Sequence, residues 1–226
     1  MRIQVWDLPT RLFHWSLAIS VSMALITGLV GGNWMVWHGR IGLVVVGLLA
    51  FRLAWGFVGS THARFTDFFP TPQRLSDYVR GAWSRHGHSP LGGLSVLALL
   101  MVLSVQVGLG LFSNDDIAFD GPLYGLVDKS TSDAMVGWHR QGLWVIVGLV
   151  ALHVLAIGFY WLARGKNLVA PMLRGWKEAD DAVTTSGGGP AVLVFALILA
   201  GAAVWFASGA WIPEPEPIPP AALPAW

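Results

Sequence analysis

The stretch VGWHRQGLWVIVGLVALHVLAIGFYWLA, residues 136–163, decides the fold, because it is long and apolar enough to cross a membrane as one helix and carries two histidines. His139 and His153 are fourteen residues apart. At about 100° per residue this spacing makes nearly four whole turns, so both imidazoles leave one helix face, about 21 Å apart along the axis. One metal ion cannot bridge that distance. Because a histidine inside a bilayer is costly without a partner, each predicts its own partner on another helix.

The composition places the chain in a membrane. Hydrophobic residues make up 54% of its 226 residues and charged residues 12%, with a mean hydropathy of +0.59, which is too apolar for a soluble domain. Five segments are long enough to cross roughly 30 Å of hydrocarbon as helices. They are residues 10–30, 37–59, 91–112, 136–163 and 190–212. The first segment starts late, contains Arg11 and His14 and lacks a small-residue cleavage site, so we expect it to stay as a helix.

The absence of cysteine limits the redox cofactors. With no cysteine in the chain, thiolate-bound iron–sulfur clusters, covalently attached haem and disulfides are excluded. Any redox cofactor must be held by histidine, methionine or oxygen ligands.

The distribution of charge predicts the orientation in the membrane. Basic residues gather in three regions that fall on one side of a five-helix arrangement, and the positive-inside rule assigns that side to the cytoplasm. These residues are Arg2, Arg11, Arg64, Arg74, Arg80, Arg85, Arg164, Lys166, Arg174 and Lys177. Residues 113–135 carry five aspartates against Lys129 and belong outside, with residues 31–36. The N-terminus is therefore expected in the cytoplasm and the C-terminus outside.

The same pattern predicts an all-α integral membrane fold with distinct parts. Residues 1–177 form a four-helix transmembrane bundle, residues 178–189 a flexible cytoplasmic linker, and residues 190–212 a fifth, C-terminal transmembrane helix. Residues 213–226 contain six prolines and predict an extended tail on the outer side. Two interpretations of the tail stay open, a disordered end and a docking arm for another subunit.

Depth in the membrane sorts the intramembrane histidines into pairs. His14 lies near the cytoplasmic start of the first helix and His38 near the outer start of the second. The fourth helix runs inward, so His139 lies near the outer surface and His153 deeper. His38 therefore pairs with His139, and His14 with His153. Because haem b iron takes four ligands from the porphyrin and two from the protein, the two pairs predict two bis-histidine haems, one above the other in the bundle.

Arginines near these histidines predict contacts with haem propionates, because a carboxylate near the membrane surface favours a guanidinium. Arg11, Arg40 and Arg140 each lie within three residues of a candidate ligand. Arginines at helix ends also extend toward water without binding anything, and both interpretations stay open. Arg52 lies about 10 Å inside the second helix, and we expect it to meet a propionate of the inner haem.

Other residues leave alternatives open. His62, His86 and His88 lie in or beside the cytoplasmic loop, where histidines are usually solvated. The alternatives are a weak metal site formed by His86 with His88 and proton handling at a quinone pocket. Several glycines allow close approach of helices or of a flat macrocycle. They lie at positions 28, 42, 47, 108, 110, 142 and 148.

Several strings in the chain match a known pattern. They are WDLPTRLFHW at 6–15, WHGR at 37–40, FRLAWGFVGSTHARF at 51–65, GHSPLGG at 87–93, WHRQG at 138–142 and LHV at 152–154. With them the chain, over residues 3–177, resembles the bacterial cytochrome b561 family, which is related to the b-type cytochrome subunits of nickel–iron hydrogenases. The resemblance implies a four-helix bundle with two non-covalent b haems, and its axial ligands correspond by position to His14, His38, His139 and His153. The fifth helix and the proline-rich tail depart from the minimal family pattern.

The resemblance and the histidine pairs predict a diheme b-type cytochrome of the bacterial inner membrane. It would transfer electrons between the quinone pool and a periplasmic redox protein or a membrane partner subunit, whether as a carrier or as a quinone-linked oxidoreductase. We also expect quinone and membrane lipid as partners, and no nucleic acid. Quinol oxidation is the favoured direction, because the acidic outer loop suits a basic cytochrome.

Two other functions are weighed against this one. The first is a superoxide:quinone oxidoreductase, although the acidic outer loop would repel an anionic substrate. The second is a haem-free membrane anchor or a transporter of protons or metal ions, which intramembrane histidines and an arginine would also suit.

Overall fold

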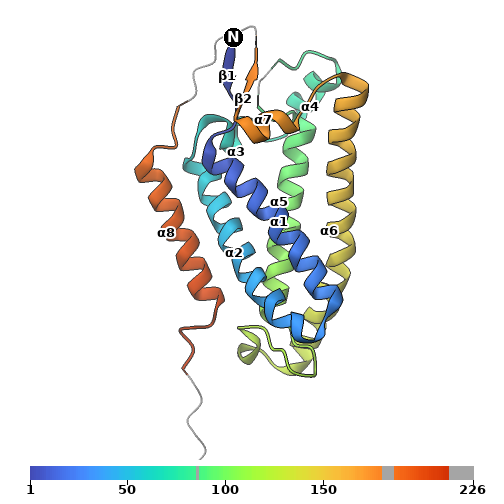
Figure 1. The fold of residues 1–226 in the computed structure, drawn as a ribbon, viewed down its shortest axis with the longest axis vertical. Coiled ribbons are helices and arrows are strands. Elements are labelled where there is room, and N and C mark those ends of the chain that lie inside the picture. Colours follow the sequence, from blue (N-terminus) through green and yellow to red (C-terminus); the bar gives the residue numbers. More distant parts are fainter. Residues whose placement is uncertain (85–86, 180–185, 214–226) are drawn as a thin grey trace, which may run out of the picture.

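Five long helices dominate the computed structural model, which describes residues 1–84, 87–179 and 186–213 (Figure 1). They are α1 (Leu8–Val30), α2 (Met35–Val58), α5 (Pro90–Leu111), α6 (Lys129–Arg164) and α8 (Pro190–Ala207). Each belongs to a segment long and apolar enough to cross a membrane. The predicted all-α membrane fold with five spanning helices is confirmed.

Short elements connect the long helices and lie at the two ends of the bundle. They are β1 (Arg2–Gln4), η1 (Gly32–Trp34), η2 (Thr61–Ala63), α3 (Phe65–Phe68), α4 (Pro72–Val79), η3 (Tyr124–Leu126), α7 (Val169–Arg174) and β2 (Trp176–Glu178). Figure 1 shows β1, β2, α3, α4 and α7 together at the end that carries the N-terminus, here called the N-terminal end. The turn from α1 to α2 and the loop from α5 to α6 lie at the opposite end.

Capping residues explain where the helices begin and end. Asp7 accepts the N–H of Thr10 at 2.7 Å ahead of α1, and Ser89 caps α5 in the same way. Asp128 accepts the N–H of Thr131 at 2.9 Å, so α6 begins at Lys129 rather than at residue 136, where the apolar stretch starts. Helix α8 ends at Ala207 rather than at residue 212, because Gly209 turns the chain with a φ of 69°.

Helix α2 is the centre of the bundle. It packs against α1, α5 and α8, whereas α6 packs chiefly against α5. Its side chains Val45, Leu49 and Trp55 lie in the main apolar core. The fifth helix approaches α2 closely, since a Cβ at Gly47 would lie 2.9 Å from Val204 on α8. Helix α8 therefore packs on the bundle of its own chain.

A two-stranded sheet joins the N-terminus to the segment that follows α6. Strands β1 and β2 pair antiparallel with Ile3 opposite Lys177, and the N–H groups of Val5 and Trp6 both donate to the carbonyl of Gly175. Ile3, Val5 and Trp6 are buried in a small cluster of their own. The sheet holds the start of α1 against α7, the short helix that follows α6.

The predicted linker lies partly outside the described residues, and the predicted tail lies almost wholly outside them. In the linker, residues 178–189, Glu178 ends β2. Ser186 forms hydrogen bonds with Thr61, whose backbone N–H donates to the Ser186 carbonyl at 3.0 Å. Of the tail, residues 213–226, only residue 213 is described. The described ends of the linker thus lie against the bundle.

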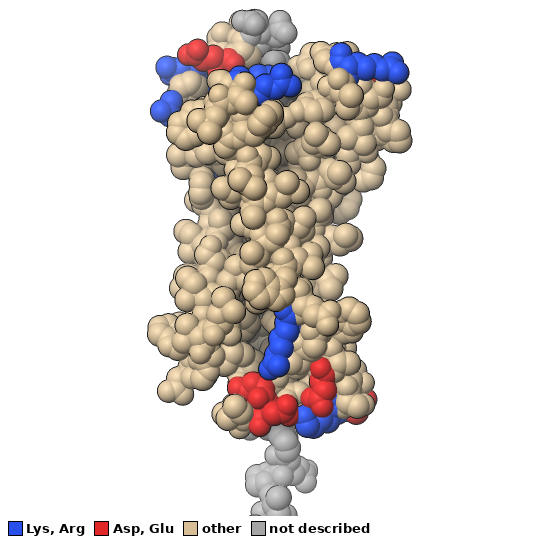
Figure 2. Space-filling model, turned by 90° about the vertical axis from the view of Figure 1, so that its right-hand side faces the viewer, with Lys and Arg blue, Asp and Glu red and all other residues tan. Residues whose placement is uncertain are grey.

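Charged side chains lie at the two ends of the molecule. On the face shown in Figure 2, Lys, Arg, Asp and Glu occupy the upper and lower ends, and the long middle zone is formed by other residues. A wide uncharged zone between charged ends is what a bilayer requires of a spanning protein. The surface therefore agrees with the five spanning helices.

Gly93→Ala is expected to lower the midpoint of thermal unfolding, because the added Cβ would clash with the backbone oxygen of Phe68, which cannot turn away as a side chain can. Overpacking of this kind costs about 1–3 kcal/mol. Circular dichroism of the purified protein in detergent during heating measures the midpoint. Leu94→Ala changes the neighbouring residue, which is 50% exposed, and serves as the control. A Gly93→Ala protein as stable as this control would contradict the packing described here.

Candidate functional site

Four histidines form two facing pairs between the helices. The ring centroids of His14 on α1 and His153 on α6 are 6.5 Å apart, and those of His38 on α2 and His139 on α6 are 5.9 Å apart. An iron ion bound at about 2 Å by one nitrogen of each imidazole requires ring centroids roughly 6 Å apart. Both pairs have the spacing that such an ion needs.

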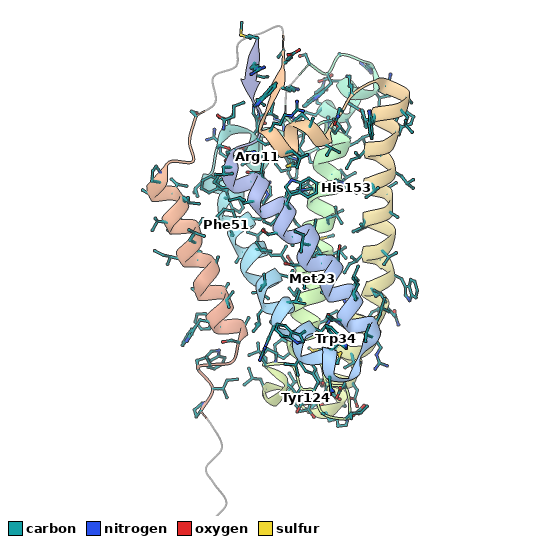
Figure 3. The ribbon with its side chains drawn as sticks, viewed as in Figure 1. Arg11, Met23, Trp34, Phe51, Tyr124 and His153 are labelled. Atoms are coloured by element: carbon teal, nitrogen blue, oxygen red, sulfur yellow. The ribbon has the colours of Figure 1, made fainter. Side chains whose placement is uncertain are left out.

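The pairs join helices whose backbones do not pack closely on one another. Among the described residues, α6 packs against α5, and α1 packs against α2; neither α1 nor α2 is a close neighbour of α6. Only 6% of the residues in the most apolar 18-residue stretch of α6 are buried inside the protein. Figure 3 shows His153 in the upper half of the bundle, near the level of Arg11. Rings that meet across such a separation suit a wide planar group held between helices.

Backbone carbonyls orient both histidines of the pair at the opposite end. His38 Nδ1–H donates to the carbonyl of Ala24 at 2.9 Å, and His139 Nδ1–H donates to the carbonyl of Gln106 at 3.0 Å. The side-chain amide of Gln106 in turn donates to the carbonyl of His139 at 2.9 Å. A histidine that donates one ring N–H to a carbonyl keeps its other nitrogen for a metal. Each Nε2 is thus available as a ligand.

Glycines give these imidazoles their room. A Cβ at Gly28 would lie 2.9 Å from the His38 ring, and one at Gly110 would lie 2.9 Å from the His139 ring. A Cβ at Gly142 would clash with the side-chain amide of Gln106. Three of the seven glycines noted in the sequence therefore make room for the side chains of His38, His139 and Gln106.

The pair at the N-terminal end is held differently. His14 Nδ1 is buried without a hydrogen-bond partner, and the His14 ring meets Trp15 edge-on with centroids 5.0 Å apart. Buried polar atoms without partners are rare in folded proteins and point to a bound group or water. His153 faces this ring from α6. The unpartnered His14 nitrogen therefore fits a site that holds a bound group.

Arg52 and Arg11 keep N–H groups available near the His14–His153 pair. Arg52 is 2% exposed, its guanidinium carbon lies 4.8 Å from the ring centroid of Phe65, and its Nη1 has no hydrogen-bond partner. Arg11 donates from Nη1 to the carbonyl of Leu173 at 2.6 Å, but its buried Nε has no partner. Buried guanidinium groups with unused N–H donors suit carboxylates such as haem propionates.

Arg40 and Arg140 are exposed at the opposite end. The Arg40 guanidinium lies 5.0 Å from the ring centroid of Trp37. No hydrogen bond or ion pair holds Arg140 within the described part of the chain. Their contacts fit both interpretations, binding of a propionate and simple extension toward water.

Two loop histidines expected to be solvated are instead packed into the protein, His62 buried and His88 half-buried. His62 is 6% exposed, and its Nδ1–H donates to the carboxylate of Asp67 at 3.0 Å. The His88 ring packs between Trp6 and Phe68, with centroids 4.5 Å from each. Burial, and then the charge of Arg52, lower the pKa of His88 to about 3. An aspartate five residues after His62 was the one sequence signal for this arrangement.

Metal clusters made by side chains alone are not part of this site. Across residues 1–84, 87–179 and 186–213, no group of three or more His, Cys, Asp or Glu side chains could hold a metal ion. Two imidazoles per site instead match a haem, which brings four ligands of its own.

Comparison with known proteins identifies relatives of the chain. The family described as prokaryotic cytochrome b561 matches residues 5–175. A protein of Azotobacter chroococcum mcd 1, named as a probable Ni/Fe-hydrogenase B-type cytochrome subunit, is 25% identical over 223 residues, covering 79% of this chain and 90% of the relative. A protein of Escherichia coli K12, named as a probable Ni/Fe-hydrogenase 1 B-type cytochrome subunit, is 22% identical over 213 residues, covering 77% and 90%. No solved structure matches the chain.

Gly110→Ala is expected to reduce haem binding at the His38–His139 pair, because the new methyl group would displace the His139 ring. Gly108→Ala is the matched control, since it lies about 200° away around the same helix and has no neighbouring atom within 4 Å. The pyridine hemochromogen assay measures haem per chain in each purified variant. Equal haem contents in the two variants would show that the glycine is not needed.

Proposed function

Because the chain belongs to the prokaryotic cytochrome b561 family, we propose that it is a diheme b-type cytochrome that carries electrons between the quinone pool and a redox partner on the periplasmic side of the bacterial inner membrane. Membership of this family, together with the five apolar helices, makes it a membrane cytochrome with haem b and a role in electron transfer. The number of haems, their ligands and the quinone are the proposed part.

One observation carries the proposal of two haems. Both histidine pairs have ring centroids near 6 Å, and their α6 members, His139 and His153, lie about 21 Å apart along that helix. Bis-histidine sites leave no open position on the iron for oxygen chemistry, so this ligand set supports electron transfer. When bound, haem b supplies an iron that accepts and returns one electron at a time.

The protein's own residues hold, orient and insulate the two sites. His38 and His139 keep fixed ring orientations through the carbonyls of Ala24 and Gln106. Ile146 lies seven residues from both His139 and His153 and is only 2% exposed, so an apolar side chain separates the two levels on α6. Arg11 and Arg52 offer buried N–H donors to the propionates of the inner haem.

Charge supports the proposed orientation. The basic residues predicted to be cytoplasmic occupy the N-terminal end, which also carries α3, α4 and α7, apart from Arg85, which lies outside the described residues. By the positive-inside rule this end faces the cytoplasm, so the His14–His153 pair is the inner one and the His38–His139 pair the outer one. The loop between α5 and α6 then faces the periplasm.

The outer loop favours a cationic partner. Lys129 is the one basic residue of this loop, and its Nζ bonds Asp116 at 2.5 Å and Asp133 at 2.9 Å, so its charge is compensated. Backbone N–H groups of Phe119, Ala118 and Ile117 lower the pKa of Asp115. The loop therefore stays negative at neutral pH and would repel superoxide, which favours electron transfer to a basic redox protein.

The hydrogenase relatives support a second kind of partner. Both relatives are named as probable subunits of Ni/Fe-hydrogenases, so we include a membrane-attached partner enzyme among the proposed partners. Family membership weighs against the haem-free anchor or transporter, because the family is one of cytochromes.

His153→Ala is expected to leave one haem per chain instead of two, because the inner iron loses an axial ligand while the outer pair keeps its carbonyl hydrogen bonds. The pyridine hemochromogen assay counts the haems, and the dithionite-reduced-minus-oxidised spectrum identifies them as b-type. Leu152→Ala, at the adjacent position with 64% exposure, is the matched control. A His153→Ala protein that retains two intact haems would rule out the proposed ligands.

Asp116→Asn with Asp120→Asn is expected to slow electron transfer to a basic c-type cytochrome several-fold at low ionic strength, because rim charges mainly set association rates. Both aspartates are exposed on the outer loop. Stopped-flow oxidation of the reduced protein at low and high salt measures the rate. Asp77→Asn at the N-terminal end is the control. Rates that do not change with salt or with the double substitution would contradict docking on this loop.

A further inference from the structure

Unpartnered buried polar atoms gather at the cytoplasmic end. In the described part of the chain, every buried side-chain nitrogen or oxygen without a hydrogen-bond partner belongs to this end. These atoms are Thr10 Oγ1, Arg11 Nε, His14 Nδ1, Arg52 Nη1, His62 Nε2 and His88 Nδ1. Propionates of the inner haem account for the arginines in the proposed function, but they do not explain the two loop histidines.

The His62–Asp67 pair has the geometry of a proton acceptor. His62 lies on η2 and Asp67 on α3, and the Nδ1–H of the imidazole donates to the carboxylate at 3.0 Å. A carboxylate in this position fixes the tautomer and stabilises the imidazolium that forms when Nε2 takes a proton. His62 Nε2 is buried and has no partner, so it is available for that proton.

His62 also lines a pocket at the cytoplasmic end. It has a volume of about 270 Å³, and its lining includes His62, Asp7, Ser60 and Ser186. Polar groups in its wall suit water, which could carry protons between His62 and the cytoplasm. Ser186 is held there by hydrogen bonds with Thr61, so the segment before α8 forms part of the wall.

Other titratable groups lie near His62. His88 stays neutral, since burial and the charge of Arg52 lower its pKa to about 3. Asp7 accepts hydrogen bonds from the Trp55 indole at 2.9 Å and from the N-terminus of α1. His88 interacts electrostatically with His62, Arg52, Asp67 and His14. His88 is thus linked electrostatically both to the His62–Asp67 pair and to His14 of the inner histidine pair.

We propose that the His62–Asp67 pair exchanges protons between the cytoplasm and the quinone that reacts at the inner haem. The proposal rests on the proposed function, which supplies the quinone and the two haems. In quinol oxidation the two O–H bonds break, the two electrons would pass to the two haems of the proposed function, one to each, and His62 Nε2 takes each proton in turn and passes it to water in the pocket. Quinone reduction runs the same exchange in reverse.

The test uses the full-length, haem-loaded protein and a short-chain benzoquinol as reductant. Haem reduction is followed by stopped-flow spectroscopy between about pH 5 and pH 8, the range in which histidines titrate. His62→Asn keeps a donor toward Asp67 but cannot take up a proton. We expect its rate to fall at least tenfold. A positioned proton acceptor typically contributes about a hundredfold or more to the rate. The rise of the wild-type rate with pH should also disappear.

External imidazole should restore the rate of His62→Asn through the pocket, an effect that a merely structural role would not produce. Asp77→Asn is the control for removing a carboxylate at this end. Haem content and reduction by dithionite should match the wild type in every variant. If His62→Asn loses haem, Asp67→Asn decides: a similar fall in rate supports the proposal, and a wild-type rate overturns it.

The two proposals fail in different ways. Wild-type protein that quinol does not reduce would overturn the proposed function, and the proton exchange with it. Wild-type protein that quinol reduces, together with a His62→Asn variant of unchanged rate and pH profile, would overturn the proton exchange alone.

Discussion

An imidazole in a bilayer must find a partner, and this constraint organises the bundle. Inside hydrocarbon an unpaired polar side chain costs free energy, and helix packing alone does not offset this cost. The two histidines on α6 meet one histidine each from α1 and α2. Helices whose backbones do not pack closely are thereby brought to a common spacing of about 6 Å between rings, and the glycines and carbonyls around the rings follow from that requirement.

The two ends of the bundle solve the same problem differently. At the outer end each imidazole has its Nδ1 hydrogen bond, and Gln106 ties α5 to α6 through His139. At the inner end a cluster of histidines, arginines and a threonine keeps unpartnered buried atoms. A rigid outer site suits electron transfer to a docked protein, and an inner site with unused donors suits exchange with a small reactant. This asymmetry connects the electron path to the proposed proton path.

The parts outside the family match take on structural roles at the same inner end. The family match ends at residue 175, just before β2 and α8. Strand β2 pairs with β1 and fixes the start of α1, on which His14 lies. The segment before α8 contributes Ser186 to the pocket beside His62, and α8 then packs on α2. The segment before α8 thus joins the fifth helix to the end of the bundle that carries the His14–His153 pair.

The sequence by itself determined the five apolar helices, the pairing of His14 with His153 and His38 with His139 by depth, and the family, because hydropathy, helical periodicity and short motifs are local properties. It placed the helix ends less well, since the cap at Asp128 lies outside the apolar stretch. The tertiary structure was needed to show that His62 is buried and His88 half-buried, that Arg52 lies among aromatic rings, and that α8 packs on α2. Each of these depends on which segments distant in sequence come together, and burial and hydrogen bonding across such contacts have no signature in a single stretch of chain.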